Sequence, residues 1–299
     1  MKKVTLIFSL LLVTILFIAN AQKGQNIVVE GAKVEKLADG FSFTEGPIAD
    51  KHGNVYFTDQ PNDKVFIWSI DGKLTEFGSF GRANGMYFDL DGRLIACADM
   101  DNELWSIGMD GRHIVLVKEF EGKKLNGPND VWVHPKNGGI YFTDPFFRRN
   151  YWTRDPVMQQ EGQYVYYLNP DRKTVVKVET NLKQPNGIVG TPDGKKLYIA
   201  DMGDSKTYVY DIRPDGTLAN KKLFCEMGSD GMTIDNKGNI YLTGRDVTVF
   251  NSKGKQILTI PVESRRTANV CFGGKDMHTL FITATESLYA LKMKVKGVK

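Results

Sequence analysis

Short apolar stretches alternate with turn residues along almost the whole chain. The recurring unit is an apolar segment, a turn with Gly beside Asp, Asn or Lys, and a second apolar segment, as in GPIAD-KHGN-VYFTD and GIVGT-PDGKK-LYIAD. Alternating Val, Ile, Tyr and Phe suit half-buried strands, and the turn pairs supply the positive φ of tight hairpins. Because no amphipathic helix of convincing length is present, the pattern predicts an all-β protein.

A polar residue stands at the start of six of these units, and the six lie roughly 40 to 55 residues apart. They are Glu45, Asn84, Asn129, Asn186, Asp230 and Asn269. This spacing is typical of a propeller blade with four strands, so the sequence predicts a six-bladed β-propeller. Equivalent positions of the blades meet near the central channel, and we expect the six side chains to form one ring there.

The last blade is one strand short. Residues 268–272, 280–284 and 287–294 give it three strands, while residues 33–37 form an unassigned strand-like segment. A ring closed by this N-terminal strand leaves no open sheet edge, which is how such folds avoid aggregation. We therefore expect the N-terminal strand to complete the last blade.

The first 21 residues have the pattern of a secretory signal peptide. Lys2 and Lys3 precede an apolar run, and Ala-Asn-Ala at 19–21 fits a cleavage site. We expect residues 1–21 to be a signal peptide, residues 22–299 to be one propeller domain, and the protein to be exported, either periplasmic or secreted. An uncleaved N-terminal anchor is the alternative, and no other stretch is long enough to span a membrane.

Charge and cysteine content narrow the possible partners. A net charge of +4 does not indicate the strongly basic surface that binds nucleic acid or an anionic membrane. Cys97, Cys225 and Cys271 are too few and too scattered for a disulfide framework, and buried free thiols are expected. The expected partner is a small-molecule substrate, bound by a monomer or a weak dimer.

The ring residues favour a hard cation. Glu45, Asn129, Asn186 and Asp230 offer two carboxylates and two amide oxygens, and such mixed oxygen donors suit Ca²⁺. Mg²⁺, Mn²⁺ or Zn²⁺ is an alternative, although the four histidines show no zinc spacing. Asn or Asp before Gly is also a common turn former, but these residues stand before the first strand of each blade rather than in its hairpin.

Residues 145–162 form a polar and aromatic insertion in the third blade, which is either a tolerated surface loop or a lid. Its aromatic residues, among them Phe146 and Trp152, could stack on a ligand, and Arg148 and Arg149 could bind carboxylate, phosphate or hydroxyl groups. No G-x-S-x-G elbow, phosphate-binding loop or G-x-G-x-x-G fingerprint is present in the sequence. Serine hydrolase, nucleotide-binding and dehydrogenase functions are therefore disfavoured.

The ordered set EGP, PND, PNG and SDG, within runs such as FTEGPIAD and LNGPNDVWVH, resembles the gluconolactonase, senescence marker protein and luciferin-regenerating enzyme family. The resemblance implies a six-bladed propeller with a divalent metal, usually calcium, and lactone hydrolysis in many members. It implies that Glu45, Asn186 and Asp230 ligate the metal, and that Asn129 touches metal or substrate with the Asp130 carboxylate beside it. Animal lactonases of the family carry a substrate-binding Arg where this chain has Gly127, so Arg82 or Arg148 could substitute.

These observations favour a metal-dependent hydrolase that opens a sugar lactone. The ion would act as a Lewis acid, Asp230 as general base, and Asn129 and Asn186 would position the substrate. Arg82, Asn84, Arg148 and Phe146 are further candidates for contact with the substrate. Asn84 and Asn269 are expected to be either blade-start residues or outer contacts with the substrate. An arylesterase or phosphotriesterase on the same metal, or a non-catalytic binding propeller, is the alternative.

Overall fold

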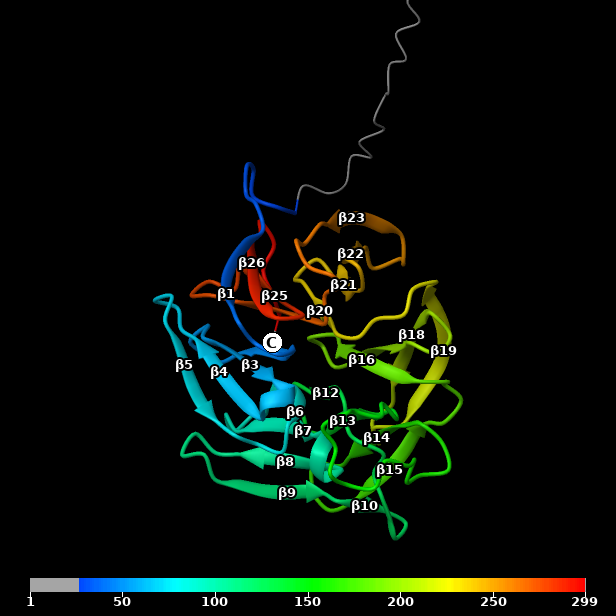
Figure 1. The fold of residues 1–299 in the computed structure, drawn as a ribbon. Helices are drawn as coiled ribbons and strands as arrows, with labels where there is room; N and C mark the ends of the chain where they lie inside the picture. Colours follow the sequence, from blue (N-terminus) through cyan, green and yellow to red (C-terminus); the bar gives the residue numbers. More distant parts are fainter. Residues whose placement is uncertain (1–26, 299) are drawn as a thin grey trace, which may run out of the picture.

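A computed structural model describes residues 27–298, and its regular structure is almost entirely β-strand (Figure 1). Six antiparallel four-stranded sheets surround a common axis, which confirms the predicted six-bladed β-propeller. The predicted signal peptide, residues 1–21, lies outside the described residues. None of the helices in the described part of the chain is long and apolar enough to cross a membrane.

Each blade runs from an inner strand beside the axis to an outer strand at the rim. In order from the axis, the blades are β2 (Thr44–Ala49), β3 (Val55–Asp59), β4 (Lys64–Trp68) and β5 (Leu74–Gly78); β6 (Ala83–Phe88), β7 (Leu94–Ala98), β8 (Glu103–Ile107) and β9 (His113–Val117); β12 (Val131–Val133), β13 (Ile140–Asp144), β14 (Tyr164–Leu168) and β15 (Val175–Glu179); β16 (Pro185–Gly190), β17 (Lys196–Asp201), β18 (Lys206–Ile212) and β19 (Leu218–Cys225); β20 (Met232–Ile234), β21 (Ile240–Thr243), β22 (Val247–Phe250) and β23 (Gln256–Ile260); and β24 (Asn269–Gly273), β25 (Thr279–Ala284), β26 (Ser287–Lys292) and β1 (Glu35–Asp39). A small hairpin, β10 (Glu119–Phe120) with β11 (Lys123–Lys124), and two single-turn 3₁₀ helices, η1 (Gln60–Asn62) and η2 (Asp99–Asp101), complete the regular structure.

The N-terminal strand closes the ring, as predicted. β1 pairs antiparallel with β26 and supplies the outer strand of the sixth blade, two residues later in the chain than the predicted segment 33–37. Each inner strand packs against the inner strand of the next blade, and β24 of the last blade packs against β2 of the first. The ring is therefore continuous around the axis.

The hairpins form where the sequence supplies an Asx turn. Between β6 and β7, Asp89 Oδ1 accepts the backbone N–H groups of Asp91 and Arg93, and Gly92 adopts a φ of 77°. A side-chain oxygen that caps its own turn favours the hairpin over other local structures, and only Gly takes such a φ without steric cost. The Asp-Gly signals in the sequence thus mark the hairpins correctly.

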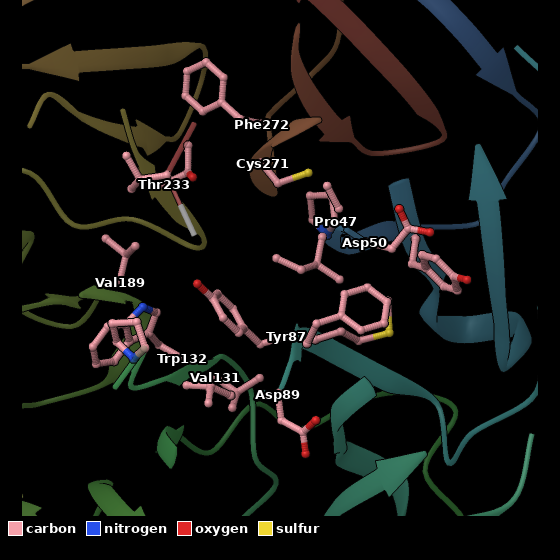
Figure 2. A pocket seen from close by; sticks show the side chains of 18 of the residues that line it. Pro47, Asp50, Tyr87, Asp89, Val131, Trp132, Val189, Thr233, Cys271 and Phe272 are labelled. Carbon is pink, nitrogen blue, oxygen red and sulfur yellow. The ribbon is translucent and has the colours of Figure 1, made fainter. Parts of the chain in front are cut away.

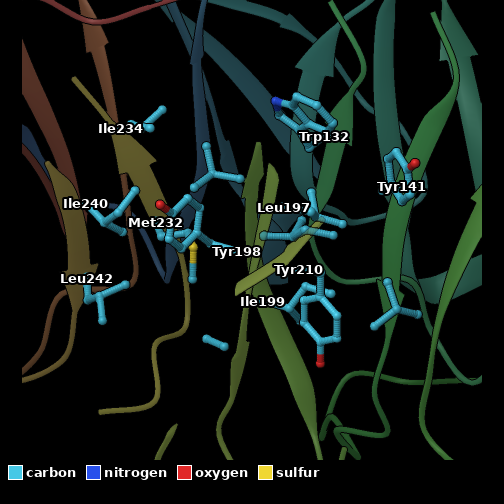
Figure 3. Packing of buried hydrophobic residues seen from close by; sticks show 14 of the residues in the cluster. Trp132, Tyr141, Leu197, Tyr198, Ile199, Tyr210, Met232, Ile234, Ile240 and Leu242 are labelled. Carbon is cyan, nitrogen blue, oxygen red and sulfur yellow. The ribbon is translucent and has the colours of Figure 1, made fainter. Parts of the chain in front are cut away.

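The core lies between neighbouring blades. In the largest cluster, Trp132, Tyr198 and Met232 come from three successive blades and pack together (Figure 3). Trp132 fits against the next blade because Gly190 stands there, where a Cβ would lie 2.2 Å from the indole ring. The three cysteines are free and buried, as predicted.

Candidate active site

The six polar residues begin the inner strands, as predicted. Four lie within the first residues of β2, β6, β16 and β24, and the other two lie two residues before β12 and β20. Five of the side chains belong to buried residues, and Asp230 is partly exposed. We call these residues the ring: Glu45, Asn84, Asn129, Asn186, Asp230 and Asn269.

The glycines beside the ring residues let the blades approach one another closely. A Cβ on Gly46, whose φ is 48°, would lie 2.0 Å from the backbone oxygen of Asn84 in the next blade. A Cβ on Gly231 would lie 1.9 Å from Cγ of Asn269, again in the next blade. The polar-Gly pairs are therefore positions where the backbone needs room for the neighbouring ring residue, and not hairpin turns.

The two acids of the ring repel one another. Burial raises the pKa of Glu45 to about 8, and the negative charge of Asp230 adds to this effect. The N–H of Gly46, which donates to Glu45 Oε2 at 3.0 Å, acts in the opposite direction, as does the charge of Arg149. Two acids placed so near each other form a site that attracts positive charge.

Both oxygens of Asp230 have partners. Asn186 Nδ2 donates to Asp230 Oδ1 at 2.8 Å, and the guanidinium of Arg266 donates to Oδ2. Arg266 comes from the segment between β23 and β24, and 47 % of its side chain is exposed. Sequence reasoning missed Arg266, although it stands three residues before Asn269 much as Arg82 stands two before Asn84.

Asn269 stands at the start of the sixth blade, as expected, and its side chain bonds an acid of the third blade. Its Nδ2 donates to both carboxylate oxygens of Asp130, at 3.2 Å and 3.4 Å. Burial raises the pKa of Asp130 well above its usual value, and the charges of Glu45 and Asp230 raise it further. Asn269 therefore joins the sixth blade to the acid of the third blade.

Two buried oxygens of the ring have no hydrogen-bond partner within residues 27–298, namely Oδ1 of Asn84 and Oδ1 of Asn186. The orientation of the Asn186 amide follows from its Nδ2, which donates to Asp230. Buried carbonyl oxygens are normally satisfied, and a hard cation is a natural partner for them. No group of three or more His, Cys, Asp or Glu side chains in the described chain could hold a metal, so a cation here would need the amide oxygens. This mixture of two carboxylates with amide oxygens fits calcium.

A cavity of about 920 Å³ occupies the channel on the far side of the ring (Figure 2). Tyr87, Trp132 and Phe272, which follow the ring residues along their inner strands, line it, and so does Val298 near the C-terminus. Asp130 and Asn269 border the cavity on the ring side. The lining is mainly apolar, and it also includes polar side chains away from the ring, among them Asp50 and Asp89.

The insertion follows β13 and therefore lies at the ring end of the propeller. Its residues converge on Asp99, a buried carboxylate in η2. Trp152 Nε1 donates to Asp99 Oδ2 at 3.1 Å, Tyr151 Oη donates to Oδ2 at 3.4 Å, and Arg154 Nη2 donates to Oδ1 at 3.4 Å. Arg149 Nε lies 3.8 Å from Oδ2. Asp99 thus anchors the insertion, and sequence reasoning did not identify it.

The arginines in and near the insertion differ in their contacts. Arg82 places its guanidinium 4.9 Å from the ring centre of Tyr151 and donates to the backbone oxygen of Pro61. Arg148 is exposed and makes no hydrogen bond or ion pair within the described chain, whereas Arg149 is close enough to lower the pKa of Glu45. Of the two adjacent arginines, Arg149 is therefore the one that the insertion holds, beside Asp99.

The insertion also determines the space around Gly127 and the packing of Phe146. Gly127 has a φ of 151°, and a Cβ there would lie 2.5 Å from Asp99 Oδ1 and 2.8 Å from Arg154 Nη2. An arginine therefore does not fit at this position unless the insertion moves. Phe146 packs on Trp152, with 5.8 Å between the ring centroids.

Comparisons with known proteins agree with this architecture. A model of the SMP-30/Gluconolactonase/LRE-like region matches residues 43–286, and the chain therefore belongs to this family. A gluconolactonase of Zymomonas mobilis is 26 % identical over 295 residues, which cover 88 % of this chain and 82 % of the relative. A diisopropyl-fluorophosphatase of Loligo vulgaris is 27 % identical over 281 residues, covering 84 % and 88 %. The solved structure of a gluconolactonase from Xanthomonas campestris superposes with a TM-score of 0.83 at 27 % identity, covering 89 % of this chain and 91 % of that one.

Proposed function

We propose that this protein is a calcium-dependent hydrolase that opens a sugar lactone. The observation that carries the proposal is the buried, unpartnered amide oxygen of Asn186, whose Nδ2 donates to Asp230, in a ring that also holds the acid Glu45. Membership of a family that includes gluconolactonases supports the choice of lactones as substrates.

Glu45, Asn129, Asn186 and Asp230 are the residues that would hold the ion. Asn129 is buried, and its side chain makes no hydrogen bond within the described residues, so its amide is available. When bound, a calcium ion supplies positive charge that polarises an ester carbonyl and stabilises the negative charge that develops on its oxygen. Its two charges balance those of Glu45 and Asp230.

In the reaction, the oxygen of a water molecule adds to the acyl carbon of the lactone and the ring C–O bond breaks. Asp230 takes the proton of this water, and the proton then passes to the alkoxide oxygen that leaves the acyl carbon. Asn186 Nδ2 holds Asp230 Oδ1 in a fixed orientation for this step. Arg266 must release Asp230 Oδ2 before that oxygen can accept the proton.

The test combines chelation with one substitution. Treatment with excess chelator should abolish hydrolysis of gluconolactone, and calcium should restore it. Asp230→Asn should lower kcat about 100-fold or more while the circular dichroism spectrum stays unchanged, because a positioned general base typically contributes that much. Full activity in excess chelator would refute the metal requirement, and full activity of Asp230→Asn would refute the assignment of the base.

A second candidate is hydrolysis of a phosphotriester at the same site. The similarity to the squid diisopropyl-fluorophosphatase favours it, because that relative covers most of this chain. Turnover of gluconolactone and of a fluorophosphate by one calcium-loaded preparation would separate the two. Faster turnover of the fluorophosphate would favour the second candidate.

The proposal includes export from the cytoplasm, which rests on the sequence of residues 1–21. Calcium is far more abundant outside cells than in the cytosol, where dedicated proteins keep it low. Expression of the full chain and mass spectrometry of the product test this part. A mature N-terminus near Gln22 is expected, and an intact Met1 in the cytoplasmic fraction would contradict export.

A further inference from the structure

Two arginines lie at the ring end of the propeller. Arg266 donates to Asp230 from the segment before β24. Arg149 comes from the insertion in the third blade, where it is held beside Asp99. The two guanidiniums therefore come from different blades and lie at the same end of the channel.

The insertion holds Arg149 without satisfying it. Arg149 Nε is buried and makes no hydrogen bond within residues 27–298, and its ion pair with Asp99 is long, at 3.8 Å. Asp99 is shared with Arg154, which donates to it at 3.4 Å and which also donates to the backbone oxygen of Asn126. Asp99 is thus shared by two guanidiniums, and the shorter contact goes to Arg154, which also lies near the charge of Asp144. Arg149 is left with a long ion pair and a buried Nε without an acceptor.

A bound divalent ion would sharpen this imbalance. Its two positive charges would neutralise Glu45 and Asp230, and Arg266 would lose the charge that now balances it. Arg149 would also gain no compensation from Glu45. The ring end would then carry two guanidiniums that need an anion, and a carboxylate is the group that arginine binds best in a planar, two-point geometry.

We propose that Arg149 and Arg266 bind a carboxylate on the substrate, which makes a lactone of a sugar acid with a second acid group the preferred substrate class. Asp99 is the positioning residue that directs Arg149 to the ring. This inference rests on the proposed lactonase function. It differs from recognition through hydroxyl groups alone, because it requires a net charge on the substrate.

The test compares glucarolactone, which carries a free carboxylate, with gluconolactone of the same ring size, which is neutral. The calcium-loaded wild-type protein should show a kcat/KM at least tenfold higher for glucarolactone. Arg149→Gln and Arg266→Gln should each remove most of this preference, mainly by raising KM for glucarolactone. Equal losses on both lactones, or no preference in the wild type, would overturn the inference.

Arg265→Gln is the matched control for Arg266→Gln. Arg265 is the preceding residue, 85 % of its side chain is exposed, and its nearest acid is Glu286 at 3.9 Å. The Arg265→Gln variant should keep the preference for glucarolactone over gluconolactone. A loss of this preference as large as in Arg266→Gln would contradict a specific role for Arg266. Arg149→Lys keeps the charge but not the planar fork, and should recover part of the preference.

A binding measurement gives a readout that does not depend on turnover. Calorimetry with glucarate and gluconate, the open-chain acids, should show tighter binding of glucarate to the calcium-loaded protein and loss of that difference in Arg149→Gln and Asp99→Asn. Indistinguishable binding of the two acids would overturn the inference. If the wild type opens neither lactone, the proposed function fails; if it opens gluconolactone as well as glucarolactone, only this inference fails.

Discussion

Asp99 and Asp144 stand at the ends of the runs LIACAD and IYFTD in neighbouring blades, Asp99 directly after β7 and Asp144 as the last residue of β13, but they hold different parts of the chain. Asp144 accepts the backbone N–H groups of Asn126 and Gly127, at 2.9 Å and 2.8 Å, and so fixes the segment that leads into its own inner strand. Asp99 instead accepts side-chain donors from the insertion, among them Trp152. The same position in the repeat therefore serves the fold in one blade and the candidate site in the next.

The difference has a local cause. In the first and fourth blades, Asp59 and Asp201 bind backbone N–H groups in the same way as Asp144. For the second blade, Asp63 of the first blade takes over this task and accepts the N–H groups of Phe80 and Arg82, at 3.1 Å and 2.7 Å. The Asp99 carboxylate therefore accepts no backbone N–H of this segment, and side chains of the insertion in the next blade donate to it instead. A position in the repeat can thus serve the site when another residue accepts the backbone N–H groups in its place.

The largest expected effect concerns the pH dependence of stability. Burial raises the pKa of Asp144 to about 7 despite its two N–H partners, so the folded protein holds this proton more tightly than the unfolded chain does. The stabilisation is complete below pH 4 and is lost as the pH rises toward 7. In chelator, the free energy of unfolding of the wild type should fall relative to that of Asp144→Asn across this window, by as much as about 4 kcal/mol at about 1.4 kcal/mol per pKa unit.

Urea unfolding of both proteins at pH 4.5, 6 and 7.5 measures this difference. The comparison cancels the contribution of Glu45, which is present in both proteins. A difference that stays constant with pH would show that Asp144 is ionised throughout and that its N–H partners outweigh burial.

Removal of the Asp144 carboxylate should lower the free energy of unfolding by nearly as much. Asp144→Ala leaves the N–H groups of Asn126 and Gly127 buried without an acceptor, and each such loss costs about 1–3 kcal/mol. We expect the free energy of unfolding at pH 7.5 to fall by about 3 kcal/mol. A loss below about 1 kcal/mol would mean that this aspartate is not the structural member of the pair.

The repeat made the fold predictable from the sequence. Hairpin pairs such as Asp-Gly have a local cause, and the recurrence of the unit fixes the number of blades, so the six sheets and the closing strand β1 could be foreseen. The bounds of β1 were displaced by two residues because strand ends depend on pairing with β26, which the local sequence does not encode. The ring residues could be named for the same reason as the blades.

The surroundings of the ring could not be foreseen in the same way. Arg266 contacts Asp230 and the amide of the ring residue Asn269 contacts Asp130 in other blades, and no local pattern indicates either contact. Arg148 and Arg149 are adjacent and chemically identical, so only the path of the insertion decides which one faces Glu45. The position of a residue within a repeat can be predicted from the sequence, whereas the direction of a side chain in an irregular loop cannot.

Gly127 is the point where the two aspartates of the comparison meet. Its N–H donates to Asp144, and its Cα faces Asp99 Oδ1 so closely that a methyl group would lie 2.5 Å away. Gly127→Ala should lower the free energy of unfolding by about 2 kcal/mol, because its φ of 151° is strained for any residue with a Cβ. The same change should displace the insertion and raise KM for glucarolactone. Unchanged stability and KM would show that the two aspartates are not coupled through this glycine.

The smallest expected effect is the one that separates the two roles most directly. Asp99→Asn and Asp201→Asn are the same chemical change at equivalent positions. Asp99→Asn leaves the guanidiniums of Arg149 and Arg154 without their carboxylate, so residues 145–162 should exchange amide hydrogens about tenfold faster, equivalent to about 1.4 kcal/mol of local stability.

Hydrogen exchange read by mass spectrometry distinguishes the two variants. In Asp201→Asn, faster exchange should appear instead near Lys183 and Gln184, whose N–H groups lose a charged acceptor, and the insertion should stay protected. If both variants loosen the same peptides, the two positions share one structural role. If only Asp99→Asn frees the insertion, the anchoring of residues 145–162 depends on a carboxylate that the repeat itself does not need.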